Sequence, residues 1–207
     1  MIKKKNTEDL EYISCNICGS KKYKFYTKNS GFDLVKCSGC GLIYANPQPT
    51  IDYLVNFYST ENLTEEEWGK KTRYSPLVEK GHCKLINFLA KRYNNKKIRI
   101  LDVGSGLNQL DNIKKRKWHI IATELSKTYV NYAKSKGWNV LFGDMIDMKF
   151  KSKEFDVITI MAVLEHLKSP KKYLLECHRL MKDDGTMIIQ IPNLNYTLKH
   201  STTLPMS

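Results

Sequence analysis

Four of the six cysteines occur in two pairs with the spacing of metal ligands. The pairs are "CNIC" and "CSGC", which supply Cys15, Cys18, Cys37 and Cys40. Residues 19–36 separate the pairs, and this spacing is typical of a zinc ribbon. The two residues inside each pair can form a tight turn, and Gly19 and Gly41 follow where the backbone must bend toward sulfur. Four thiolates fill a tetrahedral site, so we expect a structural Zn²⁺ ion with no open position for chemistry.

A second set of residues has the spacing of a nucleotide site. The stretch "RILDVGSG" reads as a buried strand followed by Gly104, Ser105 and Gly106. Glycines let the backbone approach a ligand closely, and a helix after the loop would point its N–H groups at the ligand. Glu124 ends the next predicted strand, where a carboxylate can accept both ribose hydroxyls of an adenosine. Asp144 closes the third strand, where it could accept from an adenine amino group.

The same loop favours one adenosine cofactor over others. A dinucleotide fingerprint needs glycine three residues after Gly106, but Gln109 stands there, so NAD is disfavoured. The loop also lacks the lysine and hydroxyl of a P-loop. Asp102, two residues before the first glycine, favours a ligand with a cationic end. S-adenosylmethionine, with its amino group and sulfonium, is such a ligand.

Alternating strands and helices must hold these residues in place. Strands are predicted over 98–104, 118–124, 138–144, 155–160 and 186–192, and helices over 107–117, 126–137 and 169–183. This alternation predicts an α/β fold: a Rossmann-like, doubly wound, mainly parallel sheet of at least five strands, with helices on both faces. A small zinc ribbon would precede it.

Breaks in the chain predict three regions. Residues 1–49 form the ribbon leader, in which 22–27 and 32–36 read as short strands. Residues 50–97 form a helical connector, with Thr50 capping a short helix and Ser75 capping a longer one from Pro76. Residues 98–207 form the α/β core.

The bulk composition excludes some classes and favours others. The 207 residues, 42% of them hydrophobic, allow one full domain with a small satellite. The net charge of +13 suits polyanionic partners, but it comes mostly from lysines scattered along the chain, which makes nucleic acid the weaker expectation. No apolar run approaches the ~20 residues that span a bilayer, and no hydrophobic segment follows the basic start. We therefore expect a cytoplasmic protein with reduced thiols and no membrane insertion.

Taken together, these motifs resemble a known family. The stretches "ILDVGSG", "ATELS", "GD", "FDVITIMAVLEHLKSP" and "LMKDDGTMIIQIPN" are similar, in order and spacing, to class I S-adenosylmethionine-dependent methyltransferases. The segment "CNICGS...VKCSGCGLIYANPQPT" resembles the zinc-ribbon leader of one bacterial branch of that family, often associated with sugars, surface polysaccharides or secondary metabolites.

The resemblance implies a role for each site residue. The methionine portion of the cofactor would be held by Asp102, Gly104, Ser105 and Gly106 and lined by Met161. Glu124, with its neighbour Leu125, would hold the ribose, and Asp144 and Met145 would hold the adenine. His166, in the family's "EH" pair, could be a general base that removes a proton from an acceptor hydroxyl; the alternative is a histidine that orients its loop. Ala162 stands where one subgroup has a metal-binding carboxylate, which argues against a catalytic metal.

Two departures from the family pattern bear on activity. Asn108 replaces the last loop glycine; asparagine tolerates left-handed backbone, so we expect a competent but weakened loop. After "TMIIQIPN" the chain is too short for the family's last strands, so we expect a truncated core whose exposed edge strand associates with itself or with a partner protein.

Three functions remain open at this point. The first is methyl transfer from S-adenosylmethionine to a small-molecule or sugar acceptor. The second is methyl transfer to RNA or another nucleic acid, which the ribbon and the lysines would bind. The third is a non-catalytic, methyltransferase-like subunit that needs a partner.

Overall fold

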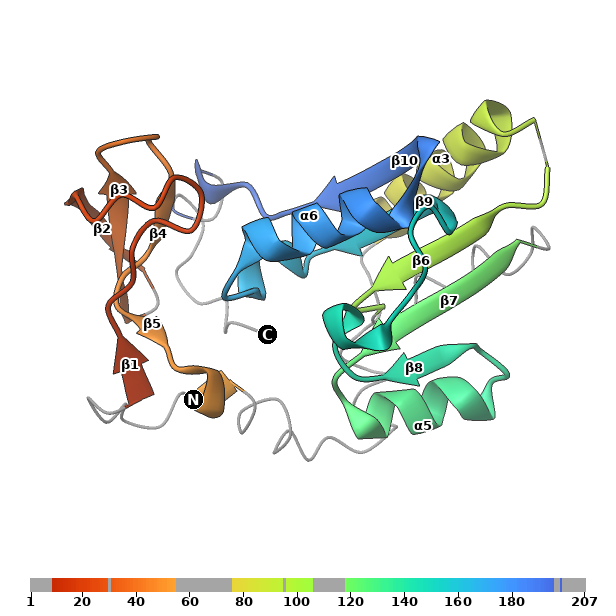
Figure 1. Cartoon of the computed structure of the whole chain (residues 1–207), viewed down its shortest axis with the longest axis horizontal. Coiled ribbons are helices and arrows are strands. Elements are labelled where there is room, and N and C mark those ends of the chain that lie inside the picture. The colour runs from red at the N-terminus through yellow and green to blue at the C-terminus, as the bar shows by residue number, and fades with distance from the viewer. Residues whose placement is uncertain are drawn as a thin grey trace. The chain divides into compact units, whose positions relative to one another are not determined.

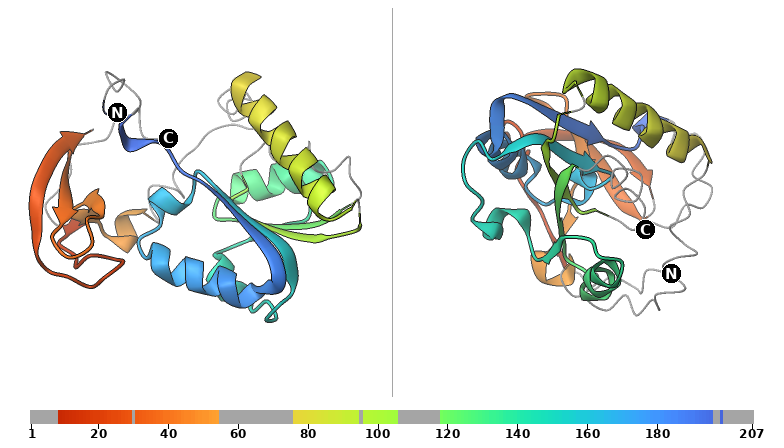
Figure 2. Two further views of the ribbon diagram at one scale, coloured as in Figure 1. Left: turned by 90° about the horizontal axis from the view of Figure 1, so that it is seen from above. Right: turned by 90° about the vertical axis from the view of Figure 1, so that its right-hand side faces the viewer.

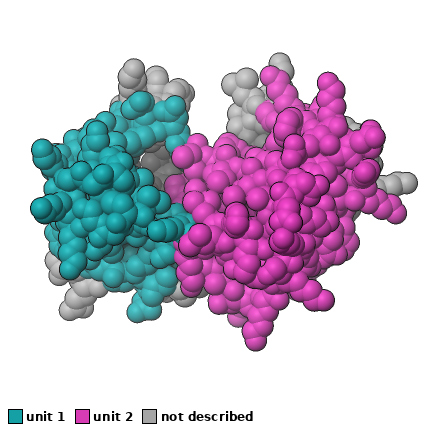
Figure 3. All heavy atoms as spheres, turned by 45° about the horizontal axis from the view of Figure 1, so that its top comes forward, with its two compact units in different colours: residues 1–58, 168–171, 192–207 teal, residues 59–167, 172–191 magenta. Residues whose placement is uncertain are grey.

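The computed structural model describes residues 9–29, 31–54, 76–94, 96–105, 118–195 and 198, without the side chains of 76–80 and 82. It divides into two compact units (Figure 3). The ribbon unit contains residues 1–58, 168–171 and 192–207, and the sheet unit contains residues 59–167 and 172–191.

The ribbon unit is built from short antiparallel strands (Figure 1). Three of them form one sheet in the order β2-β3-β4, and β1 pairs with β5. Their bounds are β1 Leu10–Glu11, β2 Tyr23–Asn29, β3 Phe32–Cys37, β4 Ile43–Ala45 and β5 Gln48–Pro49. The two strands predicted from sequence are confirmed as β2 and β3. The predicted cap of the short helix is also confirmed, because the Tyr53 N–H donates a 3.3 Å hydrogen bond to the Thr50 hydroxyl.

The sheet unit contains five parallel strands in the order β10-β9-β6-β7-β8. Their bounds are β6 Arg99–Val103, β7 His119–Glu124, β8 Val140–Phe142, β9 Phe155–Met161 and β10 Met181–Gln190. The predicted α/β fold with a parallel, doubly wound sheet is therefore confirmed. Its central strands are buried on both faces, which explains why they read as continuous apolar runs.

Helices cover both faces of this sheet (Figures 1 and 2). Helix α6 (Pro170–Leu180) packs on one face, where its Cys177 and Leu180 meet Leu101 of β6. Helices α3 (Pro76–Arg92) and α5 (Lys127–Ser135) pack on the other face, where Leu89 of α3 meets Ile100. The neighbours Leu101 and Ile100 point to opposite faces because side chains alternate along a strand.

The ends of α5 follow the sequence signals. The Ser126 side chain accepts a hydrogen bond from the Tyr129 N–H, so Ser126 is the N-cap that the sequence predicted. Gly137, just beyond the helix, has a φ of 73°, a left-handed conformation that glycine adopts without strain. The short 3-10 helices η2 (Met145–Met148) and η3 (Leu164–His166) follow β8 and β9.

The boundary between α6 and β10 differs from the prediction. The sequence predicted a helix to residue 183 and a strand from 186, whereas α6 ends at Leu180 and β10 begins at Met181. The register of β10 against β9 shifts between Met181 and Thr186, so the intervening residues form an irregularity inside the strand. Gly185 makes it possible, since a Cβ there would lie 2.3 Å from the Met181 Cγ. The stretch that contains Asp183 and Asp184 therefore belongs to β10 and is not the end of α6.

Several predicted features lie outside the described residues: the helix over 107–117, Gly106, Asn108 and the Ser75 cap. Within the part of the chain that the structure describes, no helix is both long enough and apolar enough to cross a bilayer.

Candidate functional site

The described residues that the sequence predicts to bind the cofactor lie along one edge of the parallel sheet. In a parallel sheet all carboxyl ends meet at the same edge, and ligands bind there. The register places Val103 beside Thr123 on one side and Ile160 on the other, and Glu124 beside Phe142. The tertiary structure therefore brings together the residues that follow β6, β7, β8 and β9.

Asp102 is the most unusual group at this edge. It is 1% exposed, and its Oδ1 accepts a 2.5 Å hydrogen bond from the Thr159 hydroxyl. Its Oδ2 is buried without a hydrogen-bond partner among the described residues. Burial raises the pKa of Asp102 to about 7; the bond from Thr159 opposes the shift, and the charge of Glu124 adds to it.

The loop after β6 is fitted tightly against its neighbours. Gly104 has a φ of 64°, and a Cβ there would lie 2.5 Å from the Val163 Cγ2. Its N–H donates to the Thr123 carbonyl at 2.9 Å, which ties the loop to the end of β7. Ser105 is fully buried, and its hydroxyl donates to the Tyr129 hydroxyl at 3.4 Å. A side chain at 104 would meet Val163, which is a different reason for glycine from the close approach to a ligand that the sequence predicts.

Glu124 is held in place by the chain that follows it. Its Oε1 accepts hydrogen bonds from the N–H groups of Leu125, at 2.8 Å, and Ser126, at 2.9 Å. These bonds fix the carboxylate at the start of α5. The Leu125 side chain is 53% exposed beside it, so it is available to cover one side of a bound ligand.

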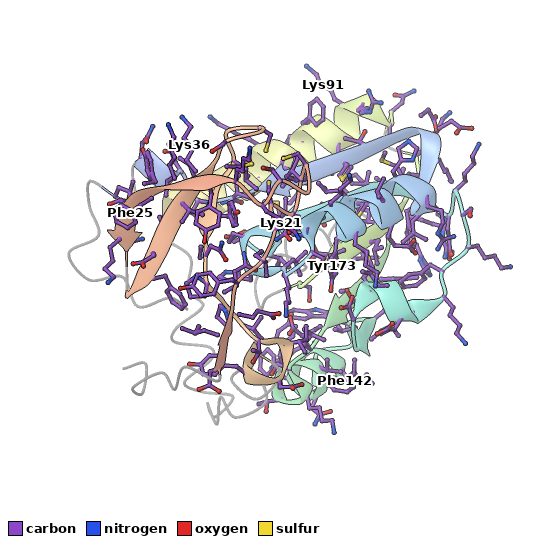
Figure 4. All side chains as sticks on the ribbon, turned by 60° about the vertical axis from the view of Figure 1, so that its left-hand side comes forward. Lys21, Phe25, Lys36, Lys91, Phe142 and Tyr173 are labelled. Atoms are coloured by element: carbon purple, nitrogen blue, oxygen red, sulfur yellow. The ribbon has the colours of Figure 1, made fainter. Side chains whose placement is uncertain are left out.

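Asp144 is fixed from two sides. Its Oδ1 accepts from the Ile146 N–H at 3.0 Å, which caps η2, and its Oδ2 accepts from the Tyr173 hydroxyl of α6. Tyr173, shown in Figure 4, is a partner that the sequence did not reveal. Met145 lies in the core with 1% exposure, where its sulfur contacts Cys177, so its side chain supports the site from below.

The segment after β9 has strained backbone beside the site. Met161 is buried at the end of β9, and the next residue, Ala162, has a φ of 56°, which is uncommon outside glycine. This turn places Val163 against Gly104 and leads into η3. His166 is exposed on η3, and its Nε2 lies 3.9 Å from the Glu165 Oε1.

The four cysteines of the ribbon converge on one point. Their sulfur atoms all lie within 4.8 Å of one another, with Cys15 and Cys40 sulfurs 3.6 Å apart and Cys18 and Cys37 sulfurs 3.5 Å apart. Tetrahedral zinc with Zn–S bonds of about 2.3 Å requires sulfur separations of about 3.8 Å. The four thiols are free, and the spacing is far from the ~2.05 Å of a disulfide. The arrangement fits a four-coordinate metal.

Both cysteine pairs use the same turn. The Gly19 N–H donates to the Cys15 carbonyl at 2.8 Å, and the Gly41 N–H donates to the Cys37 carbonyl at 3.0 Å. Both glycines have positive φ, which confirms the predicted bend. The backbone N–H groups of Cys40 and Gly39 lower the pKa of Cys37 to about 6, which favours the thiolate that binds metal.

The sheet edge also fits the cofactor predicted from sequence. A buried carboxylate oxygen that has no hydrogen-bond partner among the described residues suits a cationic group. Sequence reasoning missed Thr159 and Tyr173, which fix the two aspartates. Both come from strands or helices far along the chain, and only the strand order places them here.

Comparisons with known proteins agree with this geometry. Residues 101–189 match the family described as "Methyltransferase domain". The chain is 37% identical over 71 residues to an uncharacterized protein of Methanocaldococcus jannaschii, covering 34% of this chain and 35% of that protein. It is 25% identical over 145 residues to the ubiquinone biosynthesis O-methyltransferase of Hahella chejuensis, covering 65% of this chain and 60% of that enzyme. The chain thus spans less than two thirds of the length of these relatives.

Two solved structures match the chain with TM-scores just under 0.5. A protein from Pyrococcus horikoshii matches with a TM-score of 0.49 and 19% identity, over 72% of this chain and 71% of that one. A SAM-dependent methyltransferase from Archaeoglobus fulgidus matches with a TM-score of 0.47 and 24% identity, over 56% of this chain and 57% of that one. The five-stranded parallel sheet thus coincides with the segment, residues 101–189, that matches a methyltransferase domain.

Proposed function

We propose that this chain transfers a methyl group from S-adenosylmethionine to a small-molecule or sugar acceptor. The observation that carries the proposal is Asp102, a fully buried carboxylate with one oxygen that has no hydrogen-bond partner among the described residues, two residues before a glycine that has no room for a side chain. A structure that keeps such a group without a ligand loses stability, so its presence indicates a cationic partner.

Each predicted residue then has a role that its surroundings support. Asp102, with the Gly104–Ser105 backbone, would hold the amino group of the methionine portion, and Gly106 would extend that loop. Glu124, fixed by two backbone N–H groups, would accept the ribose hydroxyls. Asp144, fixed by Tyr173, would accept from the adenine amino group. Leu125 and Met161 would line the cofactor, and Met145, which is buried in the core, would support the adenine end from below.

Methyl transfer asks little of the protein beyond alignment. S-adenosylmethionine, when bound, supplies the methyl group on its sulfonium. His166 is exposed after β9 and can accept a proton from an acceptor hydroxyl as the new bond forms. Ala162 stands where one subgroup of similar methyltransferases has a metal-binding carboxylate, which argues against a catalytic metal.

The acceptor class rests on similarity to known enzymes. Ubiquinone biosynthesis O-methyltransferases, to which the chain is similar, act by their name in the synthesis of a small molecule. We extend this class, and not the particular substrate, to the present chain. We also propose a zinc ion on the four cysteines, a cytoplasmic location in which these thiols stay reduced, and association of the chain with itself or a partner at the edge strand β10.

Titration calorimetry with S-adenosylmethionine and S-adenosylhomocysteine tests the cofactor assignment. We expect the wild type to bind both, and Glu124→Gln to bind at least tenfold more weakly, because the ribose loses a charged acceptor. Asp183→Asn removes a carboxylate that is 83% exposed on β10, and should bind as the wild type does. Absence of heat with the wild type would favour a non-catalytic subunit.

A labelling experiment tests the acceptor class. The chain is incubated with S-adenosylmethionine labelled on its methyl group and a filtrate of small metabolites or, separately, total RNA. The proposal expects label in small molecules only. Label in RNA alone would replace it with the nucleic-acid alternative.

A further inference from the structure

The outer strand of the ribbon carries rings and positive charges that no part of the methyl-transfer proposal uses. Strand β2 lies at the edge of its three-stranded sheet. Three of its side chains are exposed aromatic rings: Tyr23 at 38%, Phe25 at 67% and Tyr26 at 42%. Exposed lysines surround them, and no acidic residue occurs from 21 to 28; these lysines are Lys21, Lys22, Lys24, Lys28 and, on β3, Lys36. We call this set the β2 surface (Figure 4).

The register adds a second feature. Lys24 and Lys36 are direct partners across β2 and β3, both exposed. Directly opposed side chains have Cβ atoms about 5 Å apart, and like charges there destabilise the sheet. Lys28 has a partner, Asp33, at 3.4 Å, but among the described residues no ion pair is formed by Lys24 or Lys36. A pair of opposed ammonium groups is relieved by a bound anion.

Aromatic rings lie next to this pair. Side chains alternate along a regular strand, so Tyr23 and Phe25 point to the face opposite Lys24, and the three residues together place rings and charge on both sides of the open edge. The register against β3 shifts between Phe25 and Thr27, which leaves Tyr26 without a partner residue across the ladder. The open edge of the sheet therefore carries the exposed rings of Phe25 and Tyr26 within one or two residues of Lys24, whose direct partner is Lys36.

We propose that the β2 surface binds single-stranded nucleic acid. Lysines neutralise phosphates, and exposed rings stack on bases, which is the combination that proteins use for single strands. A duplex hides its base faces, so it would leave the rings unused. An acidic polysaccharide would also satisfy the lysines, and its sugar rings can pack on aromatic side chains, so it is the competing ligand in the test. This surface is independent of methyl transfer, and the proposed function stands whether or not it binds.

Fluorescence anisotropy with labelled dT12 and rU12 tests the proposal on the full chain. We expect binding at low salt that weakens steeply with added salt. The variant Lys24→Gln/Lys36→Gln should weaken binding at least tenfold and flatten the salt dependence. Phe25→Ala/Tyr26→Ala should weaken it roughly 5- to 100-fold, as the loss of stacked bases does elsewhere.

Two matched controls separate this surface from general charge and ring effects. Lys84→Gln/Lys91→Gln removes the same charge from exposed positions on α3 and should change binding less than about twofold. Tyr12→Ala removes a ring that is 75% exposed outside β2 and should also have little effect. Zinc content and circular dichroism confirm that each variant is folded.

Several outcomes would overturn the proposal. They are no binding of either oligonucleotide at low salt, equal loss in the α3 lysine control, or equal binding of a duplex of the same length. Ring variants that bind as the wild type does would show recognition of charge alone, and equal binding of polygalacturonate would show that the surface does not prefer nucleic acid.

Discussion

The buried carboxyl of Asp102 is unfavourable in the ligand-free chain but is suited to binding a cationic group. Its carboxyl is fully buried, only one of its oxygens has a partner among the described residues, and its pKa is raised to about 7. Near neutral pH the group therefore exchanges a proton readily. A cationic ligand would favour the ionised form, so we expect binding of the cofactor to tighten as the pH rises through 7.

We predict that Asp102→Asn stabilises the ligand-free chain in base but not in acid. The pKa of Asp102 is about 7 in the folded chain against 3.8 for an ordinary carboxyl, so the folded state holds a proton that the unfolded state has released. The stability that this group contributes is fully present below about pH 4, and it is lost as the pH rises through the pKa that Asp102 has in the folded chain. Near pH 8.5 the variant should exceed the wild type by on the order of 3 kcal/mol in free energy of unfolding.

Urea unfolding at two pH values measures this difference. The same variant should bind S-adenosylmethionine at least tenfold more weakly, since a neutral amide attracts an ammonium group less. A gain in stability that is the same in acid and base would show that the raised pKa is not its cause.

Tyr173 is a positioning residue for Asp144. Its hydroxyl donates to the Asp144 Oδ2 from α6, while the Ile146 N–H holds the other oxygen. Tyr173→Phe keeps the ring in the core and removes only this bond. We expect about 1 kcal/mol of lost stability and a several-fold weaker affinity for S-adenosylmethionine.

Adenosine alone serves as the discriminating ligand for Tyr173→Phe. Its affinity should fall by the same factor, since Asp144 is proposed to contact only the adenine. An unchanged affinity for adenosine would exclude the positioning role.

The elements around the site depend on two close contacts between loops. The loop after β6 and the segment after β9 meet where Val163 packs against Gly104. The positive φ values of Gly104 and Ala162 show that both turns are sharp. Ser105 and Tyr129 join the first loop to α5 by a hydrogen bond. The edge is therefore prearranged by backbone shape as well as by side chains.

We predict that Gly104→Ala costs at least 1 kcal/mol in stability and abolishes cofactor binding. The new Cβ would lie 2.5 Å from the Val163 Cγ2, and alanine at a φ of 64° is strained. Adding Val163→Ala should recover part of the stability, because it removes the clash and leaves only the backbone strain.

Gly81→Ala is the matched control for thermal unfolding. Gly81 lies in α3 with no neighbour within 4 Å of an added Cβ, so alanine should stabilise the chain by up to about 1 kcal/mol. A Gly104→Ala variant as stable as the wild type would contradict the proposed close packing.

The two units of the molecule are stabilised differently. The sheet unit has three hydrophobic clusters built from β-strands and helices. In the ribbon unit the described cluster has four buried residues, and two of them, Cys15 and Cys37, are proposed metal ligands. So small a core does not stabilise a fold without a crosslink or a metal.

We predict that the chain binds about one zinc ion and that chelation unfolds the ribbon selectively. Hydrogen exchange should show loss of protection in β2, β3 and β4, with protection of β6 and β9 retained. Cys18→Ser should reproduce this pattern, whereas Cys83→Ser, at an exposed cysteine on α3, should not. A metal-free chain with a protected ribbon would remove the zinc assignment.

The sequence by itself determined the local features of this protein. Strand and helix identity, the caps of α5, the two cysteine turns and the glycine loop follow from residue types at short spacing, and the structure confirms them where it describes them. The end of α6 could not be read in this way, because the irregular start of β10 depends on its pairing with β9. Acidic residues followed by glycine are locally typical of a helix end, and only the pairing with β9 makes them part of a strand.

Only the tertiary structure decided which distant residues act together. Thr159 on Asp102, Tyr173 on Asp144 and Val163 against Gly104 are separated by 29 to 59 positions in the chain. The strand order and the packing of α6 bring them into contact, and a chain pattern contains no information about which strands are neighbours. Local preferences act over a few residues, whereas a buried carboxylate takes its properties from every element packed around it.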